Sequence, residues 1–452
     1  MRMRNATVAT VALALAATTV PAVSAQEGDW GNIDWKQFEG ESLNVLATAM
    51  PVSEVYAGVI DQFEELTGIS VDFEMMNDTD RKNTQLLDFQ GGTGDWDVSN
   101  VGISNREEFV GMDGLEPLQP FLDNADLTDA EWYDMSDYAA GVIGGGYSGG
   151  DMEAGTLVYL PFTAEYFLLW YRKDIFEELG LTAPTNIAEL YEVAEALEAA
   201  RAEGTIEQYA WTDRAMPGGG EGGWNLFTTA NRMNKLWIDF PNTQNLLLEP
   251  DALEVIDTYT DLSITDGPPG AGNWTWPDIS KAFSQGQIAM TVAGNASYGV
   301  LENPETSLVA GITGYAPPPL DNGGLDPLWE WGWAINADAA NKDAAWLFVQ
   351  WATSPTLMQQ ISPLFGVPAR TSIYSDEEYL AAMPSQEFVD SQAWMLENGI
   401  DPKAPHLMSA DYGLVADIIS AEMNAVIAGQ YDAQTAVENA AAALEKEGYP
   451  SP

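Results

Sequence analysis

The chain has 452 residues, no cysteine and a single histidine, and its 69 Asp and Glu residues outnumber its 17 Lys and Arg residues, so its formal net charge is −52. The lack of cysteine excludes disulfides, thiol catalysis and thiolate metal sites, and the negative charge argues against nucleic acid or an anionic membrane as a partner. Because the acidic residues are spread along a chain that is 46% hydrophobic, we interpret them as the solvated surface of a folded protein adapted to high salt.

Residues 1–25 have the features of a secretory signal. Arg2 and Arg4 precede an apolar run at 6–20, which is too short to span a bilayer, and residues 23–25 (VSA) form a small-residue cleavage site. No other stretch reaches the roughly 18 apolar residues of a membrane span. We therefore predict export to the periplasm, without a lipid anchor because no cysteine follows the cleavage site.

The first part of the mature chain predicts a parallel sheet. Residues 42–49 read as a strand, 55–66 have apolar residues at helical spacing with Gly68 closing the helix, and 69–75 alternate as a second strand. A second helix is expected at 80–89. A strand, a helix and a strand in so few residues form a βαβ unit.

Ligands of an open parallel sheet bind beyond the carboxyl ends of its strands. Met50 follows the first predicted strand, and Ser104 and Asn105 follow the third. These three residues are therefore candidates for a binding site. An acid-rich stretch at 123–137 lacks the alternating ligands and central glycine of a calcium loop, so we interpret it as a solvated helical face.

The stretch at 156–176 predicts a passage between two α/β lobes. A strand at 157–160 ends at Pro161, and a second run at 166–171 is apolar on both faces, as a buried strand would be. A helix then follows and ends at Gly180. Glu165 lies at the kink between the two strands, where the lobes would face each other.

Several motifs do not predict catalysis. A formal G-x-S-x-G at 146–150 is followed by glycines rather than a helix, so it does not fit a nucleophile elbow. The glycine-rich loop before Trp224 lacks the Lys-Ser/Thr of a phosphate loop, and the tryptophan fits either the core or a cleft. The single His406 has no partner motif, so we expect a satisfied or exposed structural residue.

A set of blocks in a fixed order resembles a known family. They are FEELTGISVDFE, GGTGDWDVSNVG, LPFTAEYFLLWYRKDIFEELGLTAPTNIAEL, ISKAFSQGQIAMTVAGNASYG, LWEWGWAINADAANKDAAWLF, FGVPARTSIYSD and PHLMSADYGLVADIISAEMNAVIAG. Together they resemble family 1 of the bacterial extracellular solute-binding proteins, which deliver sugars to ABC importers.

The resemblance implies a fold and an organisation. It implies an α/β, two-lobed periplasmic-binding-protein fold (type II-like), with discontinuous lobes joined by hinge crossovers. The N-terminal lobe would comprise 26–164 plus 329–366 and the C-terminal lobe 165–328 plus 367–452. A monomer without a cofactor or metal, working with the membrane subunits of an ABC importer, is expected.

The resemblance and the residue chemistry together suggest the binding site. Sugars and polyols need aromatic faces for stacking and bidentate polar side chains for their hydroxyls. Glu165 and Asn295 would bond hydroxyls, and Arg370 would brace the third crossover or pair with an acidic or phosphorylated ligand. The full set of candidates is Glu165, Asn295, Trp224, Trp331, Tyr412, Arg370, Met50, Ser104, Asn105, Tyr298 and Trp329.

Trp224, Trp331 and Tyr412 would supply the stacking surfaces, while Trp329, Trp331 and Trp333 alternate on one predicted strand and fit either core or cleft. Val101 and Ala296 stand where maltose-type members have aromatic residues, which argues against maltodextrin, and the passages GPPGAGNWTWPD and LWEWGWAI resemble polyol or small-sugar members. Two alternatives stay open: a secreted carbohydrate-active enzyme using a carboxylate pair, and a binding protein for a charged solute such as a polyamine or phosphodiester.

Overall fold

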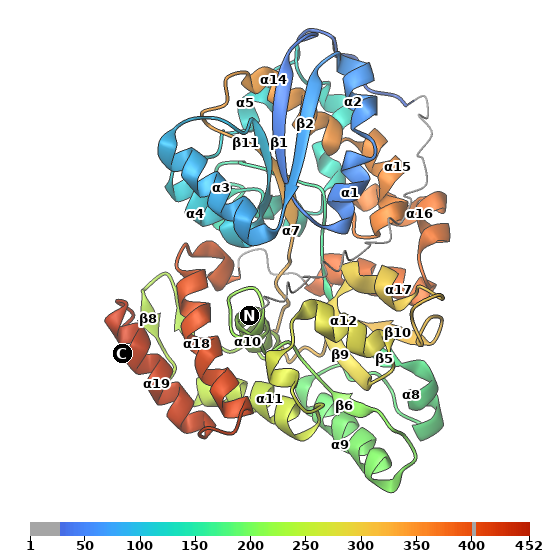
Figure 1. Cartoon of the computed structure of the whole chain (residues 1–452), viewed down its shortest axis with the longest axis vertical. Coiled ribbons are helices and arrows are strands. Elements are labelled where there is room, and N and C mark those ends of the chain that lie inside the picture. The colour runs from blue at the N-terminus through green and yellow to red at the C-terminus, as the bar shows by residue number, and fades with distance from the viewer. Residues whose placement is uncertain (1–27, 400–403) are drawn as a thin grey trace, which may run out of the picture.

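The computed structural model describes residues 28–399 and 404–452, and Figure 1 shows two α/β lobes, one above the other. The signal expected at 1–25 lies outside the described residues. We call the lobe that contains β1 the first lobe and the lobe that contains β5 the second lobe. The expected α/β, two-lobed architecture is confirmed.

A five-stranded sheet forms the centre of the first lobe. Its order is β2-β1-β3-β11-β4, with β1 parallel to β2 and β3, and with β11 antiparallel to its neighbours. The expected βαβ unit is confirmed, since Ser42 pairs with Ser70 in the parallel register. The strands are β1 (Ser42–Thr48), β2 (Ser70–Met76), β3 (Val98–Gly102), β4 (Leu160–Pro161) and β11 (Trp331–Ile335).

A four-stranded sheet forms the centre of the second lobe, in the order β10-β5-β9-β6. Only β6 and β9 are parallel to each other, so their carboxyl ends meet at one edge of this sheet. The strands are β5 (Phe167–Arg172), β6 (Tyr209–Trp211), β9 (Ile288–Gly294) and β10 (Thr313–Ala316), and a small separate hairpin pairs β7 (Ile238–Asp239) with β8 (Gln244–Asn245).

Helices cover both sheets (Figure 1). Around the first sheet lie α1 (Pro51–Ala57), α2 (Ile60–Thr67), α3 (Asp78–Gly91), α4 (Arg106–Gly111), α5 (Gln119–Leu122), α6 (Ala130–Tyr133), α7 (Ala140–Gly145), α14 (Lys342–Ala352) and α15 (Pro355–Phe365). The second lobe contains α8 (Lys173–Leu179), α9 (Ile187–Glu203), α10 (Gly222–Arg232), α11 (Pro250–Thr265), α12 (Trp276–Ser284), α13 (Tyr298–Leu301), α17 (Gln386–Trp394), α18 (Tyr412–Ile427) and α19 (Ala433–Lys446).

One helix, α16 (Glu377–Ala382), connects the lobes instead of belonging clearly to either. The hydroxyl of Tyr379 on α16 donates to the Gly366 carbonyl after α15 at 2.9 Å, and it accepts from Gln392 on α17 at 3.3 Å. The lobe boundary expected at 366/367 therefore stays a prediction, as do the boundaries at 164/165 and 328/329.

Local chemistry explains where the elements differ from the sequence prediction. The helix expected at 55–66 is two helices, α1 and α2, interrupted at Gly58 and Val59. Glycine weakens a helix interior because it has the largest backbone entropy to lose. Gly68 does end α2, and its φ of 72° lies in the left-handed region that glycine adopts without strain.

The strand expected at 157–160 is shorter than predicted. Only Leu160 and Pro161 join the sheet as β4, while Leu157 forms an isolated bridge to Tyr147. The buried run expected at 166–171 is confirmed as β5, displaced by one residue, and the helix after it, α8, ends at Gly180 as predicted.

The solvated helical face expected at 123–137 is wrong, because this stretch contains only the short α6 and one turn of 3₁₀-helix. Asp129 and Asp134 accept backbone N–H groups at the starts of these turns. Aspartate favours such capping positions over helix interiors. In the G-x-S-x-G stretch, Ser148 begins a 3₁₀ turn and its hydroxyl accepts from Thr156, so no nucleophile elbow forms.

Within the part of the chain that the structure describes, no helix combines the length and the apolar character needed to cross a membrane.

Candidate functional site

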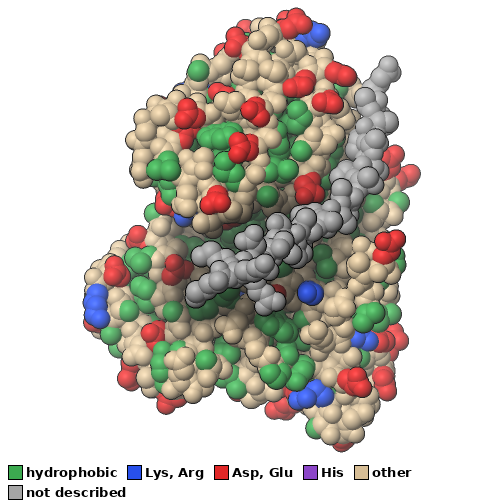
Figure 2. Space-filling view, viewed as in Figure 1, with side chains coloured by type: hydrophobic (Ala, Val, Ile, Leu, Met, Phe, Trp, Pro, Cys, Tyr) green, Lys and Arg blue, Asp and Glu red, His purple; other side chains and the backbone are tan. Residues whose placement is uncertain are grey.

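Three chain segments, 162–166, 329–331 and 367–369, run side by side between the two sheets. The Glu165 N–H donates to the Trp329 carbonyl at 2.7 Å, and the Trp329 N–H donates to the Glu165 carbonyl at 3.1 Å. The third segment pairs with the first through a backbone hydrogen bond of 2.9 Å. We call these three paired segments the hinge ribbon. Figure 2 shows the surface hollowed along the junction between the lobes.

Glu165 on the hinge ribbon is half-buried, and no other described residue hydrogen-bonds its side chain. Desolvation raises the pKa of this carboxyl to about 7, and the charge of Arg214 opposes part of that rise. Near neutral pH the group can therefore either accept or donate a hydrogen bond to a bound molecule.

Arg214 extends toward the hinge ribbon from the loop after β6. Its Nε donates to Asn225 Oδ1 at 2.9 Å and its Nη1 donates to the Gly220 carbonyl at 3.1 Å. Its Nη2 donates to no atom of the described residues. Burial lowers the pKa of the guanidinium, which still carries its charge because arginine starts from a very high value.

A row of aromatic rings connects the two lobes beneath these polar groups. Phe167 and Trp224 lie 5.8 Å apart, Trp224 meets Trp329 edge-to-face at 4.8 Å, and Trp329 and Trp331 are 6.1 Å apart. We call these four residues the aromatic row. Trp329 is the member that is half-buried, whereas Trp224 and Trp331 are buried. Trp329 is therefore the ring of the aromatic row with the most accessible surface, and the other rings pack around it.

The first lobe contributes polar groups at the other end of the aromatic row. The guanidinium of Arg81 lies 5.3 Å from the Trp331 ring, and its Nη2 donates to Asn105 Oδ1 at 3.0 Å and to Asp78 at 2.8 Å. Asn105 and its neighbour Ser104 are half-buried. These two predicted residues thus lie close to the aromatic row with part of their surface accessible.

Two predicted site residues do not have the predicted ligand role. Asn295 is fully buried, its Oδ1 accepts from the Tyr166 N–H at 3.0 Å, and its Nδ2 donates to Gln392 at 2.6 Å. Arg370 is fully buried and donates to three main-chain carbonyls, those of residues 133, 134 and 353. Asn295 therefore ties the hinge ribbon to α17. Arg370 braces the third crossover, and the alternative prediction, that it pairs with an acidic ligand, is wrong.

Tyr412 and Tyr298, two further predicted site residues, do not lie beside the accessible part of the aromatic row. The buried Tyr412 donates its hydroxyl to the Gly219 carbonyl, so it supports the glycine-rich loop from below. Tyr298 packs against Phe388 at 5.3 Å, and a Cβ added to Gly366 would collide with its ring. Met50 is half-buried at the end of β1 and packs against the first-lobe core.

The three alternating tryptophans were expected to lie either in the core or in a cleft, and they do not all have the same surroundings. Trp333 is fully buried in the first lobe, where it stacks on Phe162 at 5.3 Å and meets Tyr56 at 5.4 Å. Trp329 and Trp331 belong to the aromatic row. The distance of each tryptophan from the hinge ribbon, rather than the strand alternation, decides its surroundings.

His406, expected to be satisfied or exposed, is buried. It packs between Trp224 and Phe227, at 5.6 and 5.1 Å, and its Nε2 has no hydrogen-bond partner in the described part of the chain. Desolvation lowers the pKa of this imidazole to about 3, so it is neutral at physiological pH.

Sequence reasoning missed Arg214. The signal was its position: it lies three residues beyond β6, which is parallel to β9, and the residues after parallel strands are where ligands bind. The short strand at 209–211 carries too little pattern to be recognised, so the rule was not applied to its loop.

Two lobes that meet at a three-segment hinge, with polar groups that have no described partner beside a partly accessible tryptophan, define a two-lobed ligand-binding protein. Comparison with known proteins identifies its family: a model of the bacterial extracellular solute-binding proteins matches residues 51–359, and the chain belongs to that family. The fold agrees with a solute-binding protein from Agrobacterium radiobacter solved in complex with ribitol, at a TM-score of 0.78 and 24% identity over 90% of this chain and 99% of that one.

Two characterised relatives are similar over most of their length. An erythritol/L-threitol-binding protein from Mycolicibacterium smegmatis is 26% identical over 76% of this chain and 73% of its own. A mannitol-binding protein from Pseudomonas aeruginosa is 29% identical over 79% of this chain and 82% of its own.

Proposed function

We propose that the protein captures an open-chain polyol between its lobes and delivers it to an ABC importer. The observation that carries this proposal is the carboxyl of Glu165, which lies on the hinge ribbon beside the half-buried Trp329 and has no hydrogen-bond partner among the described residues. Glu165 lies where the two lobes are connected. A ligand that hydrogen-bonds its carboxyl therefore favours the closed arrangement of the lobes.

The chemistry of the site suits a polyol. Each hydroxyl of a polyol both donates and accepts a hydrogen bond, which matches the mixture of Glu165, Arg214 and Asn105. The C–H edges of the carbon chain can pack on Trp329. The two characterised relatives and the ribitol complex support the same ligand class. No covalent step is required, and we propose that the protein has no enzymatic activity.

We further propose that the chain works in the periplasm as a monomer. Residues 1–25 would direct export and be removed, and no cysteine is present to carry a lipid anchor. The N-terminal lobe would comprise 26–164 plus 329–366 and the C-terminal lobe the remainder, with the membrane subunits of an importer as partners.

Thermal unfolding of the mature protein, residues 26–452, tests the ligand class. Erythritol, L-threitol, ribitol and D-mannitol would be compared with maltose and putrescine at one fixed salt concentration. A ligand at 100 times its dissociation constant adds about 2.7 kcal/mol to the free energy of unfolding of the protein. The melting temperature of the protein therefore rises visibly. We expect this rise with one or more polyols, confirmed by calorimetric titration.

A rise with putrescine and no polyol would contradict the proposal in favour of a charged solute. New products after long incubation with oligosaccharides would contradict it in favour of an enzyme.

The acid-rich surface supports a proposal about salt. At a net charge of −52, self-repulsion opposes the compact state, and salt screens it within a few ångström at molar concentration. We expect the melting temperature of the unliganded protein to rise between 0.1 and about 2 M KCl. A flat or falling dependence would remove the argument for a halophilic host.

A further inference from the structure

Arg214 is exceptional among the arginines of this acid-rich chain. Arg214 forms no ion pair with the described carboxylates, although every other described arginine forms one. Those paired residues are Arg81, Arg106, Arg172, Arg201, Arg232 and Arg370. With 69 acidic residues in the sequence, a half-buried guanidinium without an ion pair among the described residues requires an explanation.

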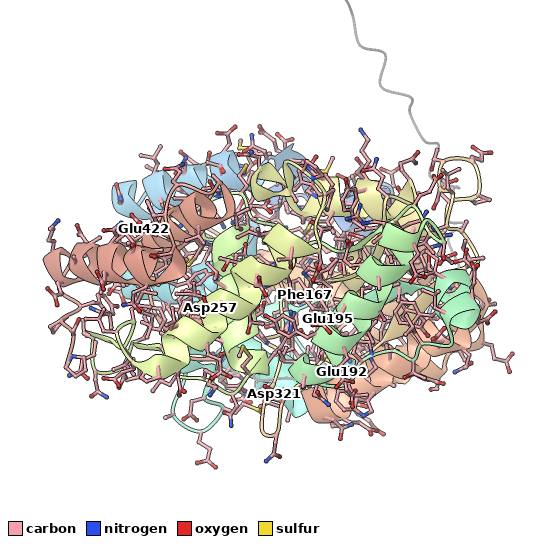
Figure 3. The ribbon with its side chains drawn as sticks, turned by 90° about the horizontal axis from the view of Figure 1, so that it is seen from below. Phe167, Glu192, Glu195, Asp257, Asp321 and Glu422 are labelled. Atoms are coloured by element: carbon pink, nitrogen blue, oxygen red, sulfur yellow. The ribbon has the colours of Figure 1, made fainter. Side chains whose placement is uncertain are left out.

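The structure holds Arg214 firmly in this unpaired position. Its carbonyl accepts from the Tyr259 hydroxyl at 2.7 Å, and its Nε and Nη1 are bonded to Asn225 and Gly220 at 2.9 and 3.1 Å. Its guanidinium carbon lies 5.3 Å from the centre of the Phe167 ring, at the second-lobe end of the aromatic row. Figure 3 shows Phe167 in the interior of the second lobe, behind the helices that carry Asp257 and Glu195. The remaining donor, Nη2, is thereby set in place with no described acceptor.

The carboxylates around Arg214 are close enough to interact with it electrostatically but do not form ion pairs with it. Glu165, Asp213 and Glu221 each interact with it electrostatically, and none of them forms an ion pair with it. Glu165 comes from the hinge ribbon and Arg214 from the β6 loop, so the two charges approach from different parts of the fold. A hydroxyl between them could accept from the guanidinium on one side and donate to the carboxylate on the other.

From this geometry we infer that Arg214 is a specificity-determining residue, which with Glu165 recognises two adjacent hydroxyl groups of the bound polyol. Nη2 of Arg214 donates to one hydroxyl, and the Glu165 carboxyl accepts from its neighbour. An anion placed here meets Glu165 and a cation meets Arg214, so the pair selects an uncharged diol. The inference rests on the proposed function and assigns the recognition to a particular pair of side chains.

The first experiment compares dissociation constants by calorimetry, using the polyol from the panel that binds the unmodified protein most tightly. Arg214→Met keeps the length of the side chain and removes its donors, and we expect binding to weaken about 10- to 100-fold, the usual effect of losing a hydrogen bond to a charged group. Arg214→Lys should recover part of the loss. The matched control is Arg201→Met on α9, an ion-paired arginine far from the hinge ribbon, which should bind like the unmodified protein.

The second experiment separates ligand contact from a structural role. A deoxy analogue of the same polyol, lacking one terminal hydroxyl, should bind the unmodified protein more weakly, and this penalty should shrink or vanish in Arg214→Met. A structural role would leave the penalty unchanged. Unaltered affinity in Arg214→Met, or a deoxy penalty of the same size in both proteins, would overturn the inference alone. Absence of binding by the unmodified protein to any polyol would overturn the proposed function as well.

Discussion

Two capping acids at the surface and two acids of the hinge ribbon have pKa values shifted in opposite directions. At the surface, the backbone N–H of Asn32 lowers the pKa of Asp129, and the backbone N–H of Tyr379 lowers that of Asp376. In the interior, desolvation raises the pKa of Glu165 to about 7 and that of Glu330 to about 8. The same functional group is therefore an ordinary anion in one region and a partly protonated acid in the other.

Acidic side chains are scattered over both lobes in Figure 2, and on the face seen in Figure 3 Glu192 and Glu195 of α9 lie near Asp257 of α11. Two interior acids have specific hydrogen-bond partners: Tyr159 donates to Glu330 at 2.7 Å, and Arg232 donates to Asp326 at 2.9 Å. The composition of the chain accounts for the surface acids, whereas the properties of the interior acids depend on individual contacts.

The largest expected effect comes from breaking an interior ion pair. Arg232 and Asp326 are both buried and are joined by two hydrogen bonds, of 2.9 and 3.2 Å. Asp326→Ala leaves a buried guanidinium without this partner, so we expect the free energy of unfolding to fall by about 3–5 kcal/mol in urea titrations. The surface counterpart is Asp251→Ala, which removes an exposed partner of Lys235 and should cost less than about 1 kcal/mol. Equal losses in the two variants would break the comparison.

The next effect is on the pH dependence of stability. The folded protein holds a proton on Glu330 up to a pKa of about 8, whereas an unfolded glutamate releases it near pH 4.3. Folding therefore binds a proton in this window, and the contribution of Glu330 to stability falls as pH rises from about 4.5 to 8, by at most about 1.4 kcal/mol per pH unit. Asp213, with its pKa raised to about 7, acts in the same direction.

Glu330→Gln should flatten this slope, because glutamine keeps the shape and does not titrate. Its Oε1 can still accept from Tyr159. Urea titrations of both proteins between pH 5 and 8 measure the difference. A slope that is the same in the variant would show that Glu330 is not protonated in the folded state.

A smaller effect in free energy, but the sharpest for function, concerns Glu165. Glu165→Ala removes two potential hydrogen bonds to a bound polyol, each with a charged group, so we expect affinity to fall about 100-fold in calorimetric titrations. The matched surface control is Glu192→Ala on α9, which should leave affinity unchanged. Unchanged affinity in Glu165→Ala would remove the hinge carboxyl from the site.

The smallest effect tests the surface acids. Asp376 caps α16 by accepting from the N–H groups of Glu378 and Tyr379, at 2.9 and 3.0 Å. Asp376→Ala should cost about 1 kcal/mol at pH 7. Because its folded pKa is lowered, this contribution is present above an unfolded pKa of about 3.9 and is lost as pH falls through the folded value, opposite in sign to Glu330. Urea titrations at pH 7 and pH 3 measure it, and a larger loss at pH 3 would contradict the capping role.

Local patterns in the sequence were enough to predict most of the elements. The strands at 42–49, 69–75 and 166–171 depend on alternation or apolar runs within a few residues, and the structure contains all three. The helix ends at Gly68 and Gly180 follow from the freedom of one glycine. The ordered blocks along the chain also identified the family before any geometry was known.

The roles of the polar side chains could not be predicted in the same way. Asn295 follows a strand as a ligand-binding residue would, yet it is fully buried because Gln392, 97 positions away, takes its amide. Arg370 is bonded to the carbonyl of Tyr133, 237 positions away. Partners at such distances are brought together only by packing of the whole chain, so no local pattern reports them.

The sequence by itself therefore determined the class of fold, the family, the acid-rich surface and the position of Glu165 at the kink between two strands. The tertiary structure alone decided which polar groups remain unpaired. Asn295 and Arg370 are hydrogen-bonded inside the protein, whereas Nη2 of Arg214 has no described partner. The physical reason is that secondary structure depends on neighbours within a few residues, whereas burial and hydrogen bonding of a side chain depend on whichever distant segments fold against it.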